Sequence, residues 1–480
     1  MNRVPAAAWL CALVACVNAV CWSLITPPFE VPDEPSHVAY VKQLAETGSL
    51  PTTSKGSFSP EESIALRDLR VQTVAERPEN QPISTRAQEN DLQRDLLRAK
   101  RSPVRGSSYA DVATAQPPLY YALEVIPYRL GASGTLLDRI ELMRLLSALM
   151  AGLTGLFGFL FIREALPGSP QAQVAGGVCV ALVPLLGFMS GAVNPDAMLY
   201  AVTAALLFAL ARSFCRGLSR RRAIALGGLT AVGLATKLNF VGIAPGVLLG
   251  LLLLTVRQAR TQGRSAYLSG ALGLAIALVP ALAYVGVHLG AGGKAFGVVS
   301  SAVATTGGSA AGELSYVWQM YLPALPGMHV DFAGVSTTRQ IWFDWYVGLY
   351  GWLDTTFPSW VYELALVPAA LIAALCLRGL LVARGALRGR AGELVVYLAM
   401  LVGLMLLIGA DSYRSFPRVD AEFGQVRYLL PMIPLLGAAV ALAVRGAGRR
   451  WAVPVGGAMI VLFLAHDVFS QLQTVARFYG

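Results

Sequence analysis

Charged residues are scarce in this sequence: Asp, Glu, Lys and Arg make up 14% of its 480 positions, against 55% for hydrophobic residues. A soluble domain usually carries about 25% charged residues. So small a share excludes an ordinary soluble protein, because much of the surface must face something other than water. The formal net charge of +10 does not indicate nucleic-acid binding, because the basic residues fall between apolar runs, where membrane topology explains them.

Cysteines and phosphate-binding motifs are also poorly represented. Five of the six cysteines lie in apolar runs, and the sixth, Cys215, lies in a basic loop. Their spacing fits neither a disulfide framework nor a zinc site, and we expect them to serve packing only. We find no Walker-type phosphate loop and no internal repeat, so nothing supports a nucleotide-binding enzyme or a repeat protein.

What the sequence does contain is a series of apolar runs, most of them close to the length that crosses a bilayer. They predict an all-α integral membrane protein with about eleven transmembrane helices. The expected spans are 5–25, 141–162, 172–191, 196–211, 223–236, 239–256, 267–289, 357–377, 393–410, 428–444 and 451–466. Because further spans follow the first run, we expect that run to be an uncleaved helix rather than a signal peptide. Lys237 and Asn239 interrupt a longer apolar stretch and predict a tight hairpin there.

The distribution of basic residues predicts the orientation. With the N-terminus in the cytoplasm, the cytoplasmic segments hold 17 Lys and Arg residues, and the opposite side holds seven outside the long first loop. This asymmetry follows the positive-inside rule. The chain then divides into 1–26, the first transmembrane helix; 27–140, an extracytoplasmic loop with amphipathic helices; 141–289, transmembrane helices 2–7; 290–356, a second, aromatic-rich extracytoplasmic loop; and 357–480, transmembrane helices 8–11 with an outer C-terminus.

Helix signals recur within the first loop. Pro35 at a first helical position and Gly48 as a stop predict a short amphipathic helix. Ser59 followed by Glu62 forms a capping box that opens a second helix. Residues 85–101 suggest a third helix. The second loop gathers tryptophan and tyrosine residues, which either stack on sugar rings or anchor the chain at the membrane interface.

The segment PPFEVPDEPSH, residues 27–37, begins where the first span ends. Its prolines stiffen the backbone, so Asp33, Glu34 and His37 stay close to the membrane surface. A carboxylate placed there can act as a general base. Helix capping is the alternative, because Asp and Glu favour helix N-termini. Capping accounts for one acid but not for two acids and a histidine within one turn, so we favour a catalytic role for Asp33 and Glu34.

A second group of polar residues lies at the expected membrane boundaries. The group consists of Gln116, Tyr120, Arg144, Asn194, Asp196, Lys237 and Arg427. Charges at such depth are costly and often functional, although Lys and Arg side chains also extend to the interface. The alternatives for the others are an aromatic belt around QPPLYY and a simple Asn-Pro turn at NPDA. We expect this group, with His37, to bind substrate or donor, and we assign no metal ligands.

The order of these segments resembles the GT-C superfamily of membrane glycosyltransferases, and most of all the bacterial multispanning family called domain of unknown function 2142. The similar segments are PPFEVPDEPSH, QPPLYY, MRLLSAL, NPDA, TKLN and GQVRYLLPMIPLL. The resemblance implies a polyprenyl-phosphate sugar donor, a bacterial plasma membrane location and an acid in the first outer loop that acts on the acceptor. That role falls on Asp33, with Glu34 as its neighbour.

The residues are compatible with this chemistry. A lipid-phosphate donor needs no nucleotide site, and a cation such as Arg427 would stabilise the departing phosphate. The expected partners are the donor, a glycan or lipid-linked acceptor and the bilayer, without nucleic acid. No cofactor is required by the pattern, and the question of a divalent cation stays open. Two alternatives remain: a flippase or transporter of lipid-linked sugars, and a polymerase or ligase of surface glycans.

Overall fold

The computed structural model describes residues 4–51, 56–76, 85–99, 111–290, 310–331, 337–419 and 425–480. Within these ranges nine helices are long and apolar enough to cross a membrane. They are α1 (Ala6–Ile25), α7 (Leu136–Ala165), α10 (Asp196–Arg216), α12 (Phe240–Gln262), α13 (Arg264–Gly290), α17 (Ser359–Arg388), α18 (Ala391–Val419), the joined η4 (Val426–Met432) and α19 (Ile433–Gly446), and α20 (Ala452–Tyr479). The all-α membrane fold expected from the apolar runs is confirmed.

The expected number of eleven spans is not confirmed. Helices α8 (Pro170–Ala181) and α9 (Pro184–Ser190) form one apolar pair that bends by 49° at a short break, which raises the number to ten within the described ranges. Pro184 stands in the first turn of α9, where its missing N–H costs nothing. The remaining expected span is α11 (Arg220–Thr236), which has 17 residues. The tight hairpin at Lys237 is confirmed, since α12 begins three residues later.

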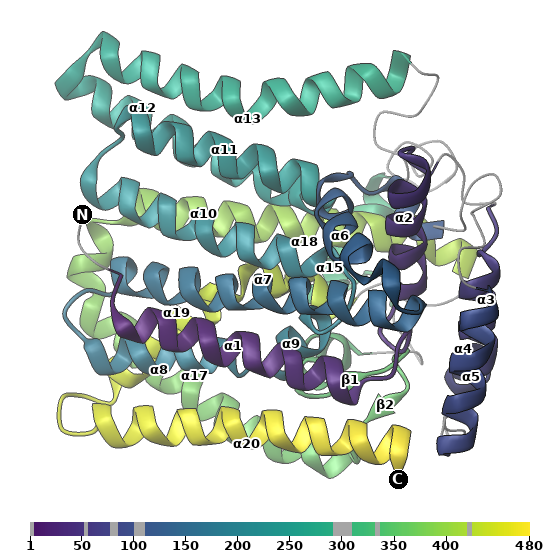
Figure 1. The fold of residues 1–480 in the computed structure, drawn as a ribbon. Helices are drawn as coiled ribbons and strands as arrows, with labels where there is room; N and C mark the ends of the chain where they lie inside the picture. The colour runs from purple at the N-terminus through teal and green to yellow at the C-terminus, as the bar shows by residue number, and fades with distance from the viewer. Residues whose placement is uncertain are drawn as a thin grey trace.

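The long helices lie side by side in one bundle (Figure 1). Helix α7 packs against α1 and α10, while α11 packs against α13, α12 against α18, and α17 against α19. Glycines allow the closest approaches: a Cβ at Gly155 would lie 2.5 Å from the carbonyl oxygen of Cys11, and one at Gly176 would meet that of Gly437. Small residues at helix crossings are typical of membrane bundles. The six cysteines are all unpaired.

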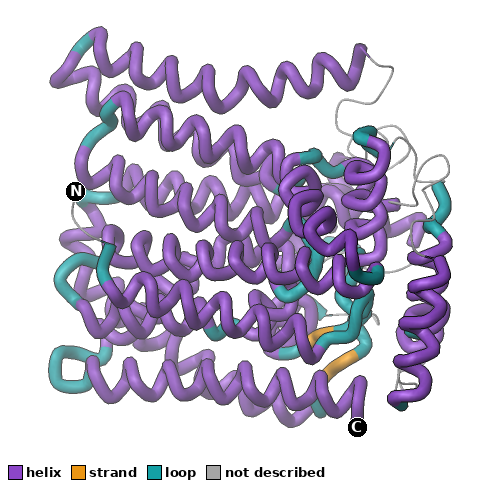
Figure 2. Tube along the Cα trace, in the orientation of Figure 1, coloured by secondary structure: helices purple, strands orange, loops and turns teal. Residues whose placement is uncertain are grey.

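Most of the shorter elements gather at one end of the bundle, here called the loop end (Figure 2). From the first loop they are α2 (Glu34–Thr47), α3 (Pro60–Asp68), α4 (Val71–Glu76), α5 (Arg86–Ala99), the 3-10 turns η1 (Asp111–Ala115) and η2 (Gly131–Ser133), and α6 (Leu119–Leu130). From the second come α15 (Ala310–Tyr321), the π-helical η3 (Gln340–Asp344), α16 (Trp345–Val347) and a hairpin of β1 (Leu349–Tyr350) and β2 (Thr355–Thr356). The strands are antiparallel, with Leu349 opposite Thr356.

The helix boundaries in the first loop follow the local sequence signals. Ser59 Oγ accepts from the Glu62 amide at 3.4 Å, and the Glu62 carboxylate accepts from the Ser59 amide at 2.7 Å, which confirms the capping box. Gly48 ends α2 with a φ of +68°, a left-handed conformation that glycine adopts without strain. Helix α2 differs from the expected amphipathic helix, because every residue from 34 to 43 is buried. This part of the helix lies inside the loop end, and only the last turn reaches its surface.

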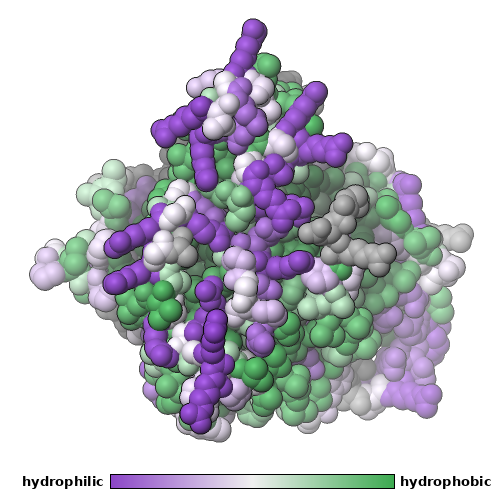
Figure 3. Space-filling model, turned by 90° about the vertical axis from the view of Figure 1, so that its left-hand side faces the viewer, coloured by the Kyte–Doolittle hydropathy of each residue, from purple (hydrophilic) through white to green (hydrophobic). Residues whose placement is uncertain are grey.

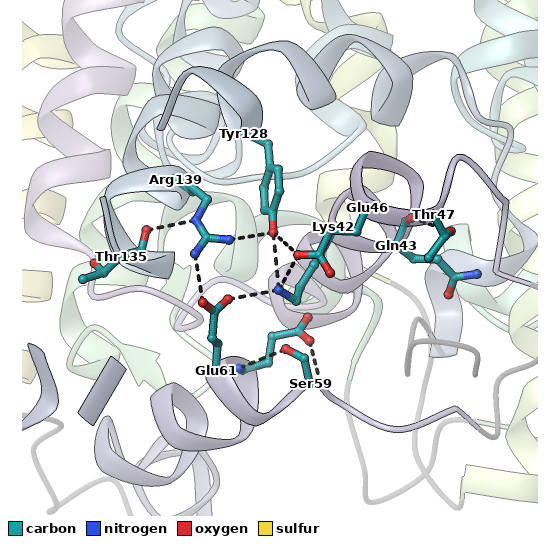
Figure 4. A network of polar contacts seen from close by, with 10 residues as sticks. Lys42, Gln43, Glu46, Thr47, Ser59, Glu61, Tyr128, Thr135 and Arg139 are labelled. Carbon is teal, nitrogen blue, oxygen red and sulfur yellow. Dashed lines mark hydrogen bonds and ion pairs between the residues drawn. The ribbon is translucent and has the colours of Figure 1, made fainter. Parts of the chain in front are cut away.

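A buried network of charges joins α2 to α3, α6 and α7 (Figure 4). Lys42 Nζ donates to Glu46 at 2.6 Å and to Glu61 at 3.0 Å, while Arg139 donates to the other Glu61 oxygen at 3.0 Å. Both cations also reach the hydroxyl of Tyr128. Each charge is compensated by opposite charges and hydrogen bonds, which is the condition for keeping such groups out of water. The network fixes the first loop on the bundle.

Candidate functional site

The proline-rich segment between α1 and α2 carries Asp33 in an unusual backbone conformation. Phe29 and Asp33 have φ angles of +72° and +69°, a region that side-chain-bearing residues rarely adopt and that often marks functional sites. Asp33 precedes α2, but its side chain makes no capping hydrogen bond. Its Oδ2 instead accepts from Arg427 Nη2 at 2.7 Å, while 29% of the side chain stays exposed. The capping alternative therefore does not account for this carboxylate.

Arg427 enters the site from the other end of the sequence, at the start of η4. Its side chain is 6% exposed, and Nη2 also donates to the Tyr428 hydroxyl at 3.1 Å. The backbone carbonyl accepts from Tyr200 at 3.3 Å, which fixes the turn. The guanidinium nitrogens Nε and Nη1 are buried and have no partner among the described residues. A buried donor without a partner is costly, so these two nitrogens are suited to an anionic ligand.

A second ion pair lies beside the first. Lys237 Nζ, in the turn between α11 and α12, is 2.8 Å from Asp196 Oδ1 at the start of α10. Asn194 accepts from the Asp196 amide at 3.0 Å, and Gln116 accepts from the Leu238 amide at 3.1 Å. These two side chains hold the turns that carry the ion pair. The Asn-Pro turn at NPDA, which was the alternative to a binding role, is thus present, with its side chains directed into the structure.

Tyr428 stands between the two cations. Its ring centroid lies 5.0 Å from the Arg427 guanidinium carbon and 5.8 Å from Lys237 Nζ, both within range of cation–π attraction. The four charges and this ring come from the residue before α2, from η4, from α10 and from the α11–α12 turn. The site is therefore assembled from segments spread over most of the chain.

His37 lies one turn after Asp33 on α2. Its Nδ1 is 2.9 Å from the hydroxyl of Tyr121, whose ring stacks on Tyr40 at 3.7 Å between centroids. Burial lowers the pKa of His37 to about 3, so the imidazole is neutral near pH 7, and its Nδ1 shares a hydrogen bond with the tyrosine hydroxyl. Burial acts to raise the pKa of Asp33, but the charges of nearby cations, Arg427 first among them, together with the hydrogen bond from Arg427 outweigh burial and hold that pKa below its ordinary value. Asp33 is thus ionised at neutral pH.

Glu34 and Arg144 form a separate ion pair, in which the hydrogen-bonding groups of both side chains are bound to the protein. Arg144 Nε and Nη2 meet the two carboxylate oxygens of Glu34 at 2.7 and 2.6 Å, and its other donors reach the carbonyls of Ser23, Thr26 and Pro27. Glu34 accepts in addition from two backbone amides, at 2.8 and 2.9 Å. Both side chains are almost completely buried. In this geometry neither side chain is accessible to a substrate.

Tyr120 is also committed to the protein. Its hydroxyl lies 2.8 Å from Ser147 Oγ, which donates to Glu124 at 3.2 Å, and the tyrosine is completely buried. Burial raises the pKa of Glu124 to about 8, so this carboxyl is mostly protonated near pH 7. The QPPLYY segment therefore serves two purposes: Gln116 positions the Lys237 turn, and Tyr120 packs α6 on α7.

A small apolar hollow adjoins the Arg427 side chain. It is lined by Pro32, by Leu185, Phe188 and Met189 of the α8–α9 region, by Trp345, Leu349 and Leu353, and by Gln425 and Val426. Within the described ranges no three His, Cys, Asp or Glu side chains converge in a way that could hold a metal ion. The site thus combines one partly exposed carboxylate, two cations and an apolar wall.

Three residues of this region were not singled out from the sequence. Tyr428 follows Arg427 directly, and Tyr121 lies in the quoted QPPLYY segment, so both were adjacent to recognised signals. Glu30 lies in PPFEVPDEPSH and is completely buried, and neither carboxylate oxygen has a partner within the described residues. Burial raises the pKa of Glu30 to about 8, with a smaller contribution from the charge of Asp354. Nothing in the local pattern signals that burial.

The chain is similar in fold to solved structures of at least two proteins, both at low sequence identity. The Archaeoglobus fulgidus oligosaccharyltransferase in its apo form has a TM-score of 0.48 and 12% identity over 98% of this chain. ArnT from Cupriavidus metallidurans has a TM-score of 0.45 and 15% identity, over 97% of this chain in its complex with undecaprenyl phosphate and 99% in its apo state. The chain spans 56% of the length of the archaeal enzyme and 75% of that of ArnT.

Comparison with protein families gives a clearer result than comparison with solved structures. No curated protein matches it. The model of the family described as "Predicted membrane protein (DUF2142)" matches residues 16–436, which include every residue of the site. The match covers far more than half of the chain, and it agrees with the family resemblance of its motifs. The chain is a multi-pass membrane protein and belongs to the DUF2142 family of predicted membrane proteins.

Proposed function

We propose that this protein is a membrane glycosyltransferase that moves a sugar from a polyprenyl-phosphate-linked donor to a cell-surface glycan or a lipid-linked acceptor. The observation that carries the proposal is the Asp33–Arg427 pair. One guanidinium nitrogen orients the carboxylate, while two others are buried and unpartnered. A base and an anion-binding group therefore lie next to each other at the loop end of the bundle.

Arg427 has the geometry that a donor phosphate requires. A planar guanidinium can meet two phosphate oxygens at once, which an ammonium cannot do with the same directionality. Arg427 begins the apolar stretch that continues into α19, so its depth suits a lipid headgroup. The apolar hollow beside it is lined mainly by hydrophobic side chains. The Lys237–Asp196 pair adds a second cation on the far side of Tyr428.

Asp33 has the properties of a general base. It is ionised at neutral pH and is the one carboxylate of the two ion pairs with substantial exposure. An acceptor hydroxyl would lose its proton to Asp33 as its oxygen forms a bond to the anomeric carbon. The bond between that carbon and the phosphate oxygen would break, with the electron pair leaving on the phosphate beside Arg427. Glu34, bound by Arg144 and two amides, would position the segment without taking part in the transfer.

We place the loop end on the extracytoplasmic side of a bacterial plasma membrane, with the N-terminus in the cytoplasm. The asymmetry of basic residues between the two ends supports this orientation. A reporter enzyme that is active only outside the cytoplasm should be active when fused after Gly56 and silent when fused after Arg221. The reverse pattern would overturn the orientation.

The transfer itself can be tested with purified protein in lipid vesicles. Radiolabelled polyprenyl-phosphate sugars are added together with a membrane extract that supplies acceptors, with and without EDTA to test a divalent cation. The parent protein should transfer label, the Asp33→Asn variant should lose about 10²-fold or more, and Asp95→Asn on the exposed face of α5 should match the parent. Transfer by Asp33→Asn at the parental rate would refute the assignment.

The same assay separates the two alternatives. A flippase would move labelled donor across the vesicle membrane without forming product, and a transporter of that kind usually has inverted repeats, which the sequence does not display. A polymerase or ligase would use the same donor but would lengthen or transfer a preassembled glycan, and the size of the labelled product distinguishes it.

A further inference from the structure

The end of the bundle opposite the loop end contains a pocket of about 610 Å³. It lies where α10 ends, α12 ends and α18 begins, and its lining includes Phe214, Leu253, Val256, Arg257, Arg260 and Arg390. This end faces the viewer in Figure 3, where hydrophilic side chains spread over the surface with hydrophobic areas between them. The pocket is far along the helices from Asp33 and is independent of the proposed transferase site.

The charges around this pocket are not balanced. Arg390 forms a bidentate pair with the buried carboxylate of Glu393, at 2.5 and 2.7 Å, and also donates to the carbonyl of Ala165. The charge of Arg390 is therefore balanced by Glu393, and its side chain forms part of the pocket wall. Among the described residues, Arg257 has one long hydrogen bond, 3.4 Å, to the carbonyl of Phe214 and no ion pair. Arg260 has no hydrogen-bond or ion-pair partner among the described residues, so two positive charges at the pocket remain uncompensated.

These two arginines, neither of which has an ion-pair partner among the described residues, lie on one face of α12. Their spacing of three residues puts them one turn apart, so both guanidinium groups can converge on a single anion. Leu253 and Val256 precede them on the same helix and line the pocket, and Val256 is 42% exposed. A cationic rim above an apolar wall at the end of a membrane-spanning helix fits an amphiphile with a negatively charged head.

We propose that this pocket binds an anionic membrane phospholipid. Arg257 and Arg260 would hold the headgroup phosphate, and Leu253 and Val256 would contact the first part of an acyl chain. Charge complementarity favours this occupant, because the Arg390–Glu393 pair contributes no net charge and the rim carries two. A free phosphate monoester shares the headgroup chemistry but makes no use of the apolar wall.

The test uses the full-length protein, purified in detergent and incubated with equimolar phosphatidylglycerol and phosphatidylcholine, with bound lipid counted by native mass spectrometry. The parent should retain phosphatidylglycerol selectively, and the double variant Arg257→Gln/Arg260→Gln should lose at least tenfold of that selectivity. The control, Arg449→Gln/Arg450→Gln, removes the same charge from the α19–α20 turn and should retain it. Equal losses in both double variants would overturn the proposal, because they would indicate general charge attraction.

A further variant separates the pocket from its rim. Leu253→Trp keeps both arginines but fills the apolar part, and it should also lose selective retention. If the tryptophan variant binds phosphatidylglycerol as the parent does, the pocket is not the site and the proposal fails. In the free-ligand arm, millimolar glycerol 1-phosphate should not displace the lipid. Complete displacement at that concentration would show a site for free phosphate instead.

Discussion

Two buried clusters of charged side chains lie at the loop end, and they differ in how many of their polar atoms have a partner within the protein. In the network around Glu61, the Lys42 ammonium group donates three hydrogen bonds to side chains of the protein, and each Glu61 oxygen accepts from a different cation (Figure 4). In the cluster around Arg427, two guanidinium nitrogens and Asp196 Oδ2 have no hydrogen-bond partner within the described residues. Satisfied charges of the first kind hold elements together. Unsatisfied ones are kept at a cost and point to a ligand.

The largest expected effect tests the satisfied cluster. Arg139→Met leaves Glu61 with one cation in place of two, in a site that water does not reach. Removing one partner of a buried pair costs about 3–5 kcal/mol, so the apparent unfolding temperature in detergent should fall strongly. Arg129→Met is the matched control, because Arg129 is exposed and, within the described part of the chain, donates to the Ala45 carbonyl alone. A fall no larger than in the control would mean that the network does not hold the loop.

The unsatisfied cluster should respond in the opposite way. Arg427→Ala should lower the transfer rate about 10²–10³-fold, the usual loss for one well-placed donor, with little change in unfolding temperature. Arg427→Lys keeps the charge without the bidentate geometry and should retain part of the rate. Both are measured as initial rates at saturating acceptor, with Arg339→Ala as an exposed control at the same end. If the alanine variant works at the parental rate, Arg427 does not bind the phosphate, and another cation such as Lys237 must do so.

A smaller effect concerns Glu30, which belongs to neither cluster. Its pKa rises from an ordinary 4.5 to about 8 on folding, so the folded state binds more protons than the unfolded state between these values. Stability should therefore fall as the pH rises from about 4.5 to about 8, by at most a few kcal/mol. Unfolding midpoints of Glu30→Gln across this range should lack that component, whereas Glu141→Gln on an exposed position of α7 should keep it. Parallel curves for Glu30→Gln and the parent would exclude the titration.

The smallest effect separates positioning from binding. Gln116→Ala removes one hydrogen bond to the Lys237 turn, worth about 0.5–1.5 kcal/mol. We expect a rate loss of less than tenfold, carried mainly by a higher KM for the donor, because the turn becomes looser without losing its charge. Gln88→Ala on the exposed part of α5 should change neither constant. A loss confined to kcat would indicate that Gln116 contacts the reacting groups.

The sequence allowed good predictions wherever structure depends on near neighbours. The ends of α2, the capping box of α3 and the hairpin at Lys237 all follow from signals within a few residues. The importance of Asp33 and Arg427 was inferred from their depth at membrane boundaries, and the structure joins them in one ion pair. Their catalytic and binding roles stay predictions.

Other features depend on packing between distant segments and have no local signal. The partner of Glu34 is Arg144, 110 positions away, and the sequence had no signal for this pairing, which occupies the carboxylate that stood next to Asp33 as a candidate. The burial of residues 34–43 of α2 likewise follows from what covers them and not from their own periodicity. The span count is not confirmed at α11, which is short, or at the α8–α9 break, where one apolar run holds a bent pair of helices.

The Arg144 side chain has a consequence for the order in which the protein is made. It binds the carbonyls of Ser23 and Thr26 at the end of α1, yet it is synthesised more than a hundred residues later, with a separation of 121 positions from Ser23. Until α7 emerges from the ribosome and inserts, those carbonyls and the carboxylate of Glu34 lack their cation. The first loop therefore cannot reach its final conformation until α7, which follows it in the chain, has inserted. The site residue Asp33 accordingly reaches its position only after α1 and α7 have packed together in the membrane.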